Sequence, residues 1–164
     1  NVLGAIALAA ACATLREHRR LVTHREEDLT ERLVAGLRAI DGVETFSIFG
    51  EDHDRAPVVS FVIDGLEPGL VSAALSAEHA IAVRDGKFCA HLLVDALLED
   101  AGVEARSAVR VSAGLANTDE HIERLLAAVE SLATRGPRAA YHVVEGEGWV
   151  PVEDPRDLSV TLPW

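Results

Sequence analysis

The spacing of hydrophobic residues changes along this chain, from the helical period of about 3.6 residues to the two-residue alternation of strands. Helical and strand-like segments follow one another and are separated by turn-forming residues, and a short hairpin closes the chain. This order predicts a small α/β (α+β) fold in which helices pack on one face of a mostly antiparallel sheet. The predicted helices are residues 2–15, 16–40, 69–79, 89–102 and 117–134, and the predicted strands are residues 43–50, 58–65, 81–84 and 107–115.

After the last helix, the sequence from Tyr141 onward predicts a C-terminal hairpin that turns at residues 146–148. We expect Tyr141 and Trp149 to dock this hairpin at the edge of the sheet. No internal repeat or low-complexity run interrupts the pattern.

The interior of such a fold has to be built from small and aliphatic side chains. Of the 164 residues, 49% are hydrophobic but only 4% are aromatic. A chain of this length suits one domain with a sizeable core. The formal net charge of −12 argues against a nucleic-acid partner, because binding phosphates needs a basic face.

The first 15 residues are apolar and rich in alanine. They are too short to span a membrane and no basic segment precedes them, so we predict a buried helix packed on both sides. Cys12 lies in this helix and is expected to be a core residue. Cys89 is the second of two cysteines, which form no disulfide framework and favour a reducing, cytoplasmic setting. Cys89 and His91 together offer too few ligands for a zinc site.

Cys89 lies at the junction between a strand-like run and a helical pattern, in the segment IAVRDGKFCAHLL (81–93). If the helix begins at about Cys89 or Ala90, its dipole and the charges of Arg84 and Lys87 favour the thiolate. Gly86 permits a sharp turn that presents the thiol. A small buried packing residue explains the same position equally well, so both interpretations are open at this point.

Arg110 is the second unusual residue. Alternation in residues 107–115 places it, with Ala108, on the opposite face of a strand from Val109 and Val111. An arginine between small residues in the middle of a strand requires an anion, and a guanidinium suits a carboxylate. With 27 acidic residues in the chain, an internal partner is the simpler explanation from local sequence alone.

Taken together, these segments resemble a known family. HAIAVRDGKFCAHLL (79–93), followed by VRVSAGLANTDEHIERLLAAV (109–129), is similar to the C-terminal part of class V aminotransferase-fold enzymes, which depend on pyridoxal phosphate. The resemblance is greatest to cysteine desulfurases and selenocysteine lyases. Several motifs agree in order and spacing. They comprise Arg84, Gly86, Cys89 and Ala90 in the first segment, Arg110, Ser112, Asn117 and Thr118 in the second, and the opening Asn1 with its alanine-rich helix.

The resemblance implies a role for each unusual residue. Cys89 corresponds to the nucleophile that takes sulfur from substrate cysteine as a persulfide, and Arg110 to the arginine that holds the substrate α-carboxylate. Arg84 corresponds to a neighbouring active-site arginine. Two features depart from the family pattern: Phe88 stands where desulfurases commonly carry a polar residue, and the tail after Gly136 has no usual counterpart.

The same resemblance implies how the chain is organised. Residues 1–40 correspond to inter-domain helices, residues 41–135 to the small C-terminal α/β domain of a fold-type I pyridoxal-phosphate enzyme, and residues 136–164 to a C-terminal extension. The intact enzyme is expected to be a homodimer that acts on a small amino-acid substrate. We expect no nucleic acid and no membrane among its partners.

A pyridoxal enzyme needs a lysine for its Schiff base, and the single lysine here is Lys87, in the cysteine loop. The family places its cofactor lysine elsewhere. Because the chain starts at Asn1 and has no methionine, we expect a fragment or a processed product that is inactive alone. The intact protein is expected to use pyridoxal 5'-phosphate, bound mainly by a preceding region.

Two alternatives to a desulfurase are open. The same fold serves as an aminotransferase, an epimerase or another carbon–sulfur lyase in which Cys89 is a bystander. A non-catalytic α/β dimerisation module is the alternative of a different class.

Overall fold

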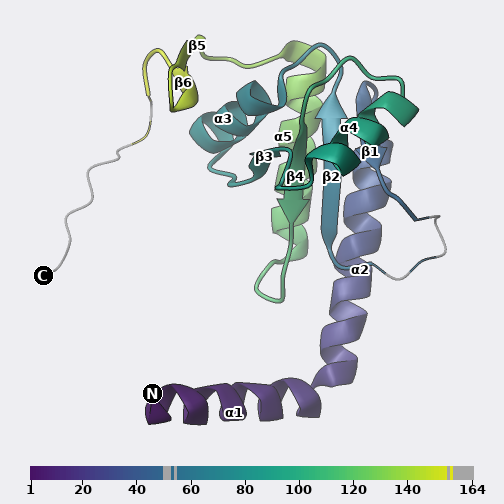
Figure 1. Cartoon of the computed structure of the whole chain (residues 1–164), viewed down its shortest axis with the longest axis vertical. Coiled ribbons are helices and arrows are strands. Elements are labelled where there is room, and N and C mark those ends of the chain that lie inside the picture. The colour runs from purple at the N-terminus through teal and green to yellow at the C-terminus, as the bar shows by residue number, and fades with distance from the viewer. Residues whose placement is uncertain (50–52, 54, 155, 157–164) are drawn as a thin grey trace, which may run out of the picture.

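The computed structural model describes residues 1–49, 53, 55–154 and 156 (Figure 1). A four-stranded sheet forms its centre, helices lie on both sides of it, and a separate two-stranded hairpin follows the last helix. The helices are α1 (Val2–Glu17), α2 (Arg19–Arg38), α3 (Pro68–His79), α4 (His91–Asp100) and α5 (Asp119–Arg135). The strands are β1 (Val43–Phe46), β2 (Val58–Ile63), β3 (Arg84–Gly86), β4 (Ala108–Ser112), β5 (Tyr141–Val144) and β6 (Gly148–Pro151).

The central sheet has the strand order β1-β2-β4-β3, and every pair of neighbours is antiparallel. The predicted fold class is therefore confirmed. Strand β2 carries buried residues on both faces, which explains its nearly continuous apolar sequence, VVSFVI. Strand β3 has only three residues and lies at one edge, where it pairs with β4 alone.

The main core lies between one face of the sheet and helices α2, α3 and α5. Leu29, Leu33 and Leu37 are spaced four residues apart on α2, and all three are completely buried. Because this spacing puts them on one side of the helix, α2 contributes a continuous apolar stripe. The alternation predicted for β4 is confirmed, since Val109 and Val111 belong to this core.

Helix α4 differs from the expectation that helices cover one face only. Val94 and Leu98 of α4 pack with Val62 of β2 and Ala108 of β4 in a second, smaller cluster. Because these two strand residues alternate with those of the main core, α4 covers the opposite face. The short helix therefore shares its side of the sheet with Arg110, which lies two residues after Ala108 on β4.

Helix α1 forms where it was predicted, but the prediction that it is buried is wrong. The side chain of Asn1 caps it by accepting a hydrogen bond from Gly4 N at 2.8 Å. None of its residues is buried, and Val2 and Leu3 are 76% and 80% exposed. Figure 1 shows why: α1 turns away from the lower end of α2 and extends clear of the sheet and the other helices. Cys12 is exposed with it, which corrects the expectation of a core residue.

The predicted strand at residues 81–84 is wrong in position, because the observed strand begins at Arg84. Helix α3 ends with Ala80 in the left-handed conformation, at φ +53°. Ile81 N then donates a hydrogen bond to Leu75 O at 3.0 Å, so the chain after α3 first closes the helix. Strand β1 is also shorter than predicted: it ends at Phe46, and the Ser47 hydroxyl caps a turn by accepting from Phe49 N.

In the part of the chain that the structure describes, no helix is both long enough and apolar enough to cross a membrane.

The C-terminal hairpin forms as predicted, with β5 and β6 paired antiparallel and a turn between them. It docks on α3, however, and not on the edge of the sheet. The Glu78 carboxylate, only 4% exposed, accepts hydrogen bonds from Arg138 N, Ala139 N and Tyr141 Oη and from Arg138 Nε. Trp149 Nε1 donates to Glu67 Oε2 at 2.9 Å. The hairpin is thus bound to both ends of α3.

This docking is expected to weaken in acid. Burial raises the pKa of Glu78, but the hydrogen bonds from Ala139, Arg138 and Tyr141 outweigh it and lower the pKa below its usual value. Because the pKa of Glu78 is lower in the folded than in the unfolded state, its carboxylate stabilises the folded state. This stabilisation is complete above the unfolded-state pKa, about 4.3, and is lost as the pH falls through the folded-state pKa. In a Trp164→Phe chain, the fluorescence of Trp149 is predicted to be constant from pH 7 to about 5 and to change below about 4.3.

In Glu78→Gln, the hairpin loses about 1–3 kcal/mol of charge-assisted hydrogen bonding. The Trp149 fluorescence of this variant at pH 7 should therefore already be shifted toward the value that the wild type has in acid. Glu145→Gln, at an exposed position in the hairpin turn, is the matched control and should follow the wild type. An unchanged acid transition in Glu78→Gln contradicts this assignment.

Candidate functional site

Arg84 and Arg110 lie directly opposite each other on neighbouring strands of the sheet. Ser60 of β2 is the partner of Arg110 on its other side. Directly opposed residues of antiparallel strands share one face. Since Arg110 lies on the face that α4 covers, the two arginines and the serine form one row there.

Two guanidinium groups in one cross-strand pair are unfavourable without an anion, because like charges opposite each other repel. The Nε atom of Arg110 is buried and has no hydrogen-bond partner among the described residues. Its guanidinium carbon lies 4.9 Å from the centre of the Phe88 ring, a cation–π contact. The internal carboxylate partner that the sequence left open is therefore not found in the described part of the chain. This row of side chains can therefore bind the carboxylate of a molecule that is not part of the chain.

Cys89 is exposed, in the loop that joins β3 to α4. Gly86 has φ +110°, and two non-glycine residues, Phe88 at φ +54° and Cys89 at φ +60°, lie in the left-handed region. Ala90 N donates to Lys87 O at 2.8 Å and closes the turn. The buried packing role that local sequence left open is thereby excluded in this chain. The loop presents the thiol to solvent and holds the Phe88 ring against Arg110.

Two details of the cysteine loop differ from expectation. Helix α4 begins at His91, with Ala90 as its N-cap, so Cys89 lies one residue outside the cap. The Lys87 ammonium lies 2.6 Å from Asp95 Oδ1 on α4, so its charge is paired within the protein. Arg84 is exposed and lies four residues before Phe88. The structure thus brings Arg84, Arg110 and Phe88 together, and Cys89 follows Phe88 directly.

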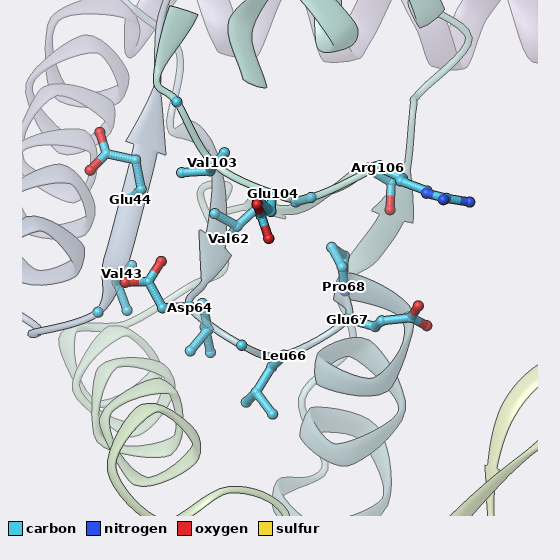
Figure 2. A pocket seen from close by; sticks show the side chains of 17 residues that line it. Val43, Glu44, Val62, Asp64, Leu66, Glu67, Pro68, Val103, Glu104 and Arg106 are labelled. Carbon is cyan, nitrogen blue, oxygen red and sulfur yellow. The ribbon is translucent and has the colours of Figure 1, made fainter. Parts of the chain in front are cut away.

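A cavity that was not predicted from the sequence lies elsewhere. It has a volume of about 900 Å³ and lies among the ends of β1 and β2, the turn that leads into α3, and residues 102–107. Figure 2 shows the carboxylates of Glu44, Asp64, Glu67 and Glu104 spread around it, without converging on one point. Neither Cys89 nor either arginine lines it. Within the described ranges, no three His, Cys, Asp or Glu side chains are grouped to hold a metal ion.

The strained conformation of Cys89 leads to a test of the loop geometry. Glycine adopts φ near +60° at no steric cost, whereas a residue with a Cβ atom loses about 1–2 kcal/mol there. Cys89→Gly is therefore predicted to have a higher free energy of unfolding than Cys89→Ala, by about 1 kcal/mol. Urea denaturation of both variants measures the difference.

The control is Ala96→Gly, at an exposed position within α4. Glycine there is expected to destabilise by about 1 kcal/mol, the opposite sign, because it weakens a regular helix. If Cys89→Gly is less stable than Cys89→Ala, the loop does not have the described conformation.

The chain is similar to known proteins over most of its length. Residues 1–125 match the family model described as Aminotransferase class-V. A "Probable cysteine desulfurase" of Xylella fastidiosa (strain 9a5c) is 36% identical over 130 residues, which cover 79% of this chain and 29% of that protein. The apo structure of cysteine desulfurase from Thermococcus onnurineus NA1 has a TM-score of 0.64 and 31% identity, over 81% of this chain and 31% of that one.

An X-ray structure of a NifS-like protein from Rickettsia africae ESF-5 is similar in fold, with a TM-score of 0.62 and 23% identity, over 80% of this chain and 34% of that one. The chain thus spans about a third of the length of the relatives it matches. The family match ends at residue 125, so the C-terminal hairpin lies outside it.

Proposed function

This chain belongs to the class-V aminotransferase family, and we propose that it is the C-terminal part of a pyridoxal-phosphate-dependent cysteine desulfurase. The relatives named above support this proposal by their names and by their similarity over most of the chain. In it, residues 1–40 are inter-domain helices, residues 41–135 the small C-terminal domain and residues 136–164 an extension. The intact enzyme is a cytoplasmic homodimer that acts on a small amino acid.

The observation that carries the proposal is the arginine pair, together with the exposed thiol in the loop that follows β3. Arg110 and Arg84 are in register on one face of the sheet, and a carboxylate placed at this pair relieves their repulsion. The buried Nε of Arg110 supplies an unused donor, and a guanidinium can bind a carboxylate with two parallel hydrogen bonds. We assign Arg110 to the substrate α-carboxylate and Arg84 to a supporting contact beside it.

Cys89 is assigned as the sulfur acceptor. Its exposure and the strained loop that holds it suit a nucleophile that must meet both a bound substrate and a later acceptor. In the reaction, the thiolate of Cys89 would form a bond to the sulfur of substrate cysteine as the carbon–sulfur bond breaks. The electron pair of that bond would stay on the carbon, where bound pyridoxal phosphate would supply the electron sink until a proton is added and the amino acid leaves as alanine. Cys89 is left as a persulfide. Binding the substrate by its carboxylate converts this attack into a reaction between two positioned groups.

The residues of this chain do not by themselves fit the cofactor. A Schiff base with pyridoxal 5'-phosphate requires a lysine, and the single lysine, Lys87, is bound to Asp95 at 2.6 Å. In the proposal, these residues therefore supply the sulfur acceptor and the carboxylate anchor, and the Schiff-base lysine lies outside residues 1–164.

Kinetics of the full-length protein test the two roles separately. Cys89→Ala is predicted to lower sulfide release from cysteine at least about 100-fold while the visible absorbance of the bound cofactor is retained. Arg110→Lys should raise the KM for cysteine about tenfold, because an ammonium cannot reproduce the paired contact. Cys12→Ala, at the other exposed cysteine, is the control and should match the wild type. Unchanged turnover in Cys89→Ala sinks the desulfurase assignment and leaves a class-V reaction in which Cys89 is a bystander.

The segment of residues 1–164 alone is predicted not to form a Schiff base with added pyridoxal 5'-phosphate. The Lys87 ammonium would first have to leave Asp95, a charge-assisted contact. Absorbance spectroscopy after removal of free cofactor checks this. A retained visible band that disappears in Lys87→Ala would show that this segment carries the cofactor lysine after all.

A further inference from the structure

The C-terminal hairpin and its flanking residues run along α3 and bind it at several points. Glu67, the N-cap residue of α3, accepts the Trp149 hydrogen bond at 2.9 Å. Arg156 Nη1 donates to Ser76 Oγ at 2.7 Å in the second half of the helix. Glu78, the second-last residue of α3, accepts several hydrogen bonds from residues 138–141. We call residues 138–152 the strap, since they lie beside the helix from end to end.

The strap and strand β3 meet at one glycine. A Cβ atom added to Gly69, in the first turn of α3, would lie 3.0 Å from Trp149 Cδ1 and 3.6 Å from Asp85 Oδ2. The indole ring of the strap and the middle residue of β3 therefore lie against the same point of α3. A methyl group at this position would require the Trp149 ring to shift by a few tenths of an ångström and would be in ordinary contact with Asp85.

At the other end of α3, the strap binds the backbone that leads into β3. Arg138 Nη2 donates to Glu78 O at 3.0 Å. Two residues later, Ala80 takes its left-handed conformation and the chain turns toward Arg84. The strap thus fixes both the start of α3, which touches β3, and the end of α3, from which β3 follows.

Strand β3 requires support of this kind. It has three residues, pairs with β4 on one side only, and carries Arg84 opposite Arg110. The loop after it holds Phe88 and Cys89 in the left-handed region. Such conformations persist only where the surrounding structure enforces them. In the segment of residues 84–89, Phe88 is held by its packing in the smaller cluster. The other end of this segment, at Arg84, has to be held from the side of α3.

We propose that the strap is a positioning element of the active site, which holds β3 through the contact of Trp149 with Gly69 and so fixes Arg84 and the Cys89 loop. Trp149 and Gly69 are positioning residues, because they act through β3 and touch no substrate. For its effect on turnover, this inference rests on the proposed function.

Hydrogen exchange tests the strap without any activity measurement. In Trp149→Ala, the amides of β3 and of residues 87–90 are predicted to exchange at least tenfold faster in the full-length protein, whereas those of α5 stay protected. Gly69→Ala, which shifts the indole ring by a few tenths of an ångström, should also raise exchange in β3, by a smaller factor. It covers the case in which Trp149→Ala folds poorly. Trp149→Phe keeps a ring against Gly69 and should restore slow exchange. Val143→Ala, at an exposed position of β5, is the matched control. Unchanged exchange in β3 when Trp149→Ala and Gly69→Ala are both folded overturns the proposal.

Kinetics then test the link to the active site. With Arg84 displaced and the Cys89 loop loosened, the KM for cysteine should rise about tenfold in Trp149→Ala and kcat should fall as well, and Trp149→Phe should return both to normal. Faster exchange with an unchanged KM overturns the positioning role. If Cys89→Ala keeps full turnover while the exchange results hold, the proposed function fails and the strap's hold on β3 stands.

Discussion

The structure is organised around two arginines that oppose each other across one pair of strands. Arg84 and Arg110 are in register between β3 and β4, on the face that α4 covers, and Phe88 lies against the guanidinium of Arg110. Such a pair opposes folding by its own repulsion. The main core on the other face of the sheet, built from α2, α3 and α5, stabilises the strands that hold it. The repulsion at the pair is what makes a carboxylate favourable there.

Much of this architecture follows from local sequence, and α5 is the clearest case. The helix predicted at residues 117–134 is observed at Asp119–Arg135, with Thr118 as its N-cap, Asp119 and Glu120 in its first turn, and its apolar residues on one buried face. The alternation of β4 correctly separated Arg110 from Val109 and Val111. These predictions succeed because they depend on residues within a few positions of each other.

The predictions that failed, and the contacts that were not predicted, depend on how different segments of the chain meet. The burial of α1 was inferred from its apolar composition, but composition does not say whether a partner lies alongside, and the described residues provide none. The opposition of Arg84 and Arg110 depends on strand register, which their separate segments do not encode. Lys87 and Asp95 pair across the turn into α4, which removed one of the charges expected beside Cys89. The contact of Trp149 and Asp85 with Gly69 joins three segments of the chain.

The proposed enzyme divides its work between this chain and residues outside it. In this proposal the chain supplies a thiol and a carboxylate anchor, and its single lysine is paired with Asp95. The most direct measurement is mass spectrometry of the full-length protein after incubation with cysteine and no reductant. We predict the added mass of one sulfur atom on the peptide that contains Cys89, and none on the peptide that contains Cys12. Sulfide production with an unmodified Cys89 peptide would contradict it.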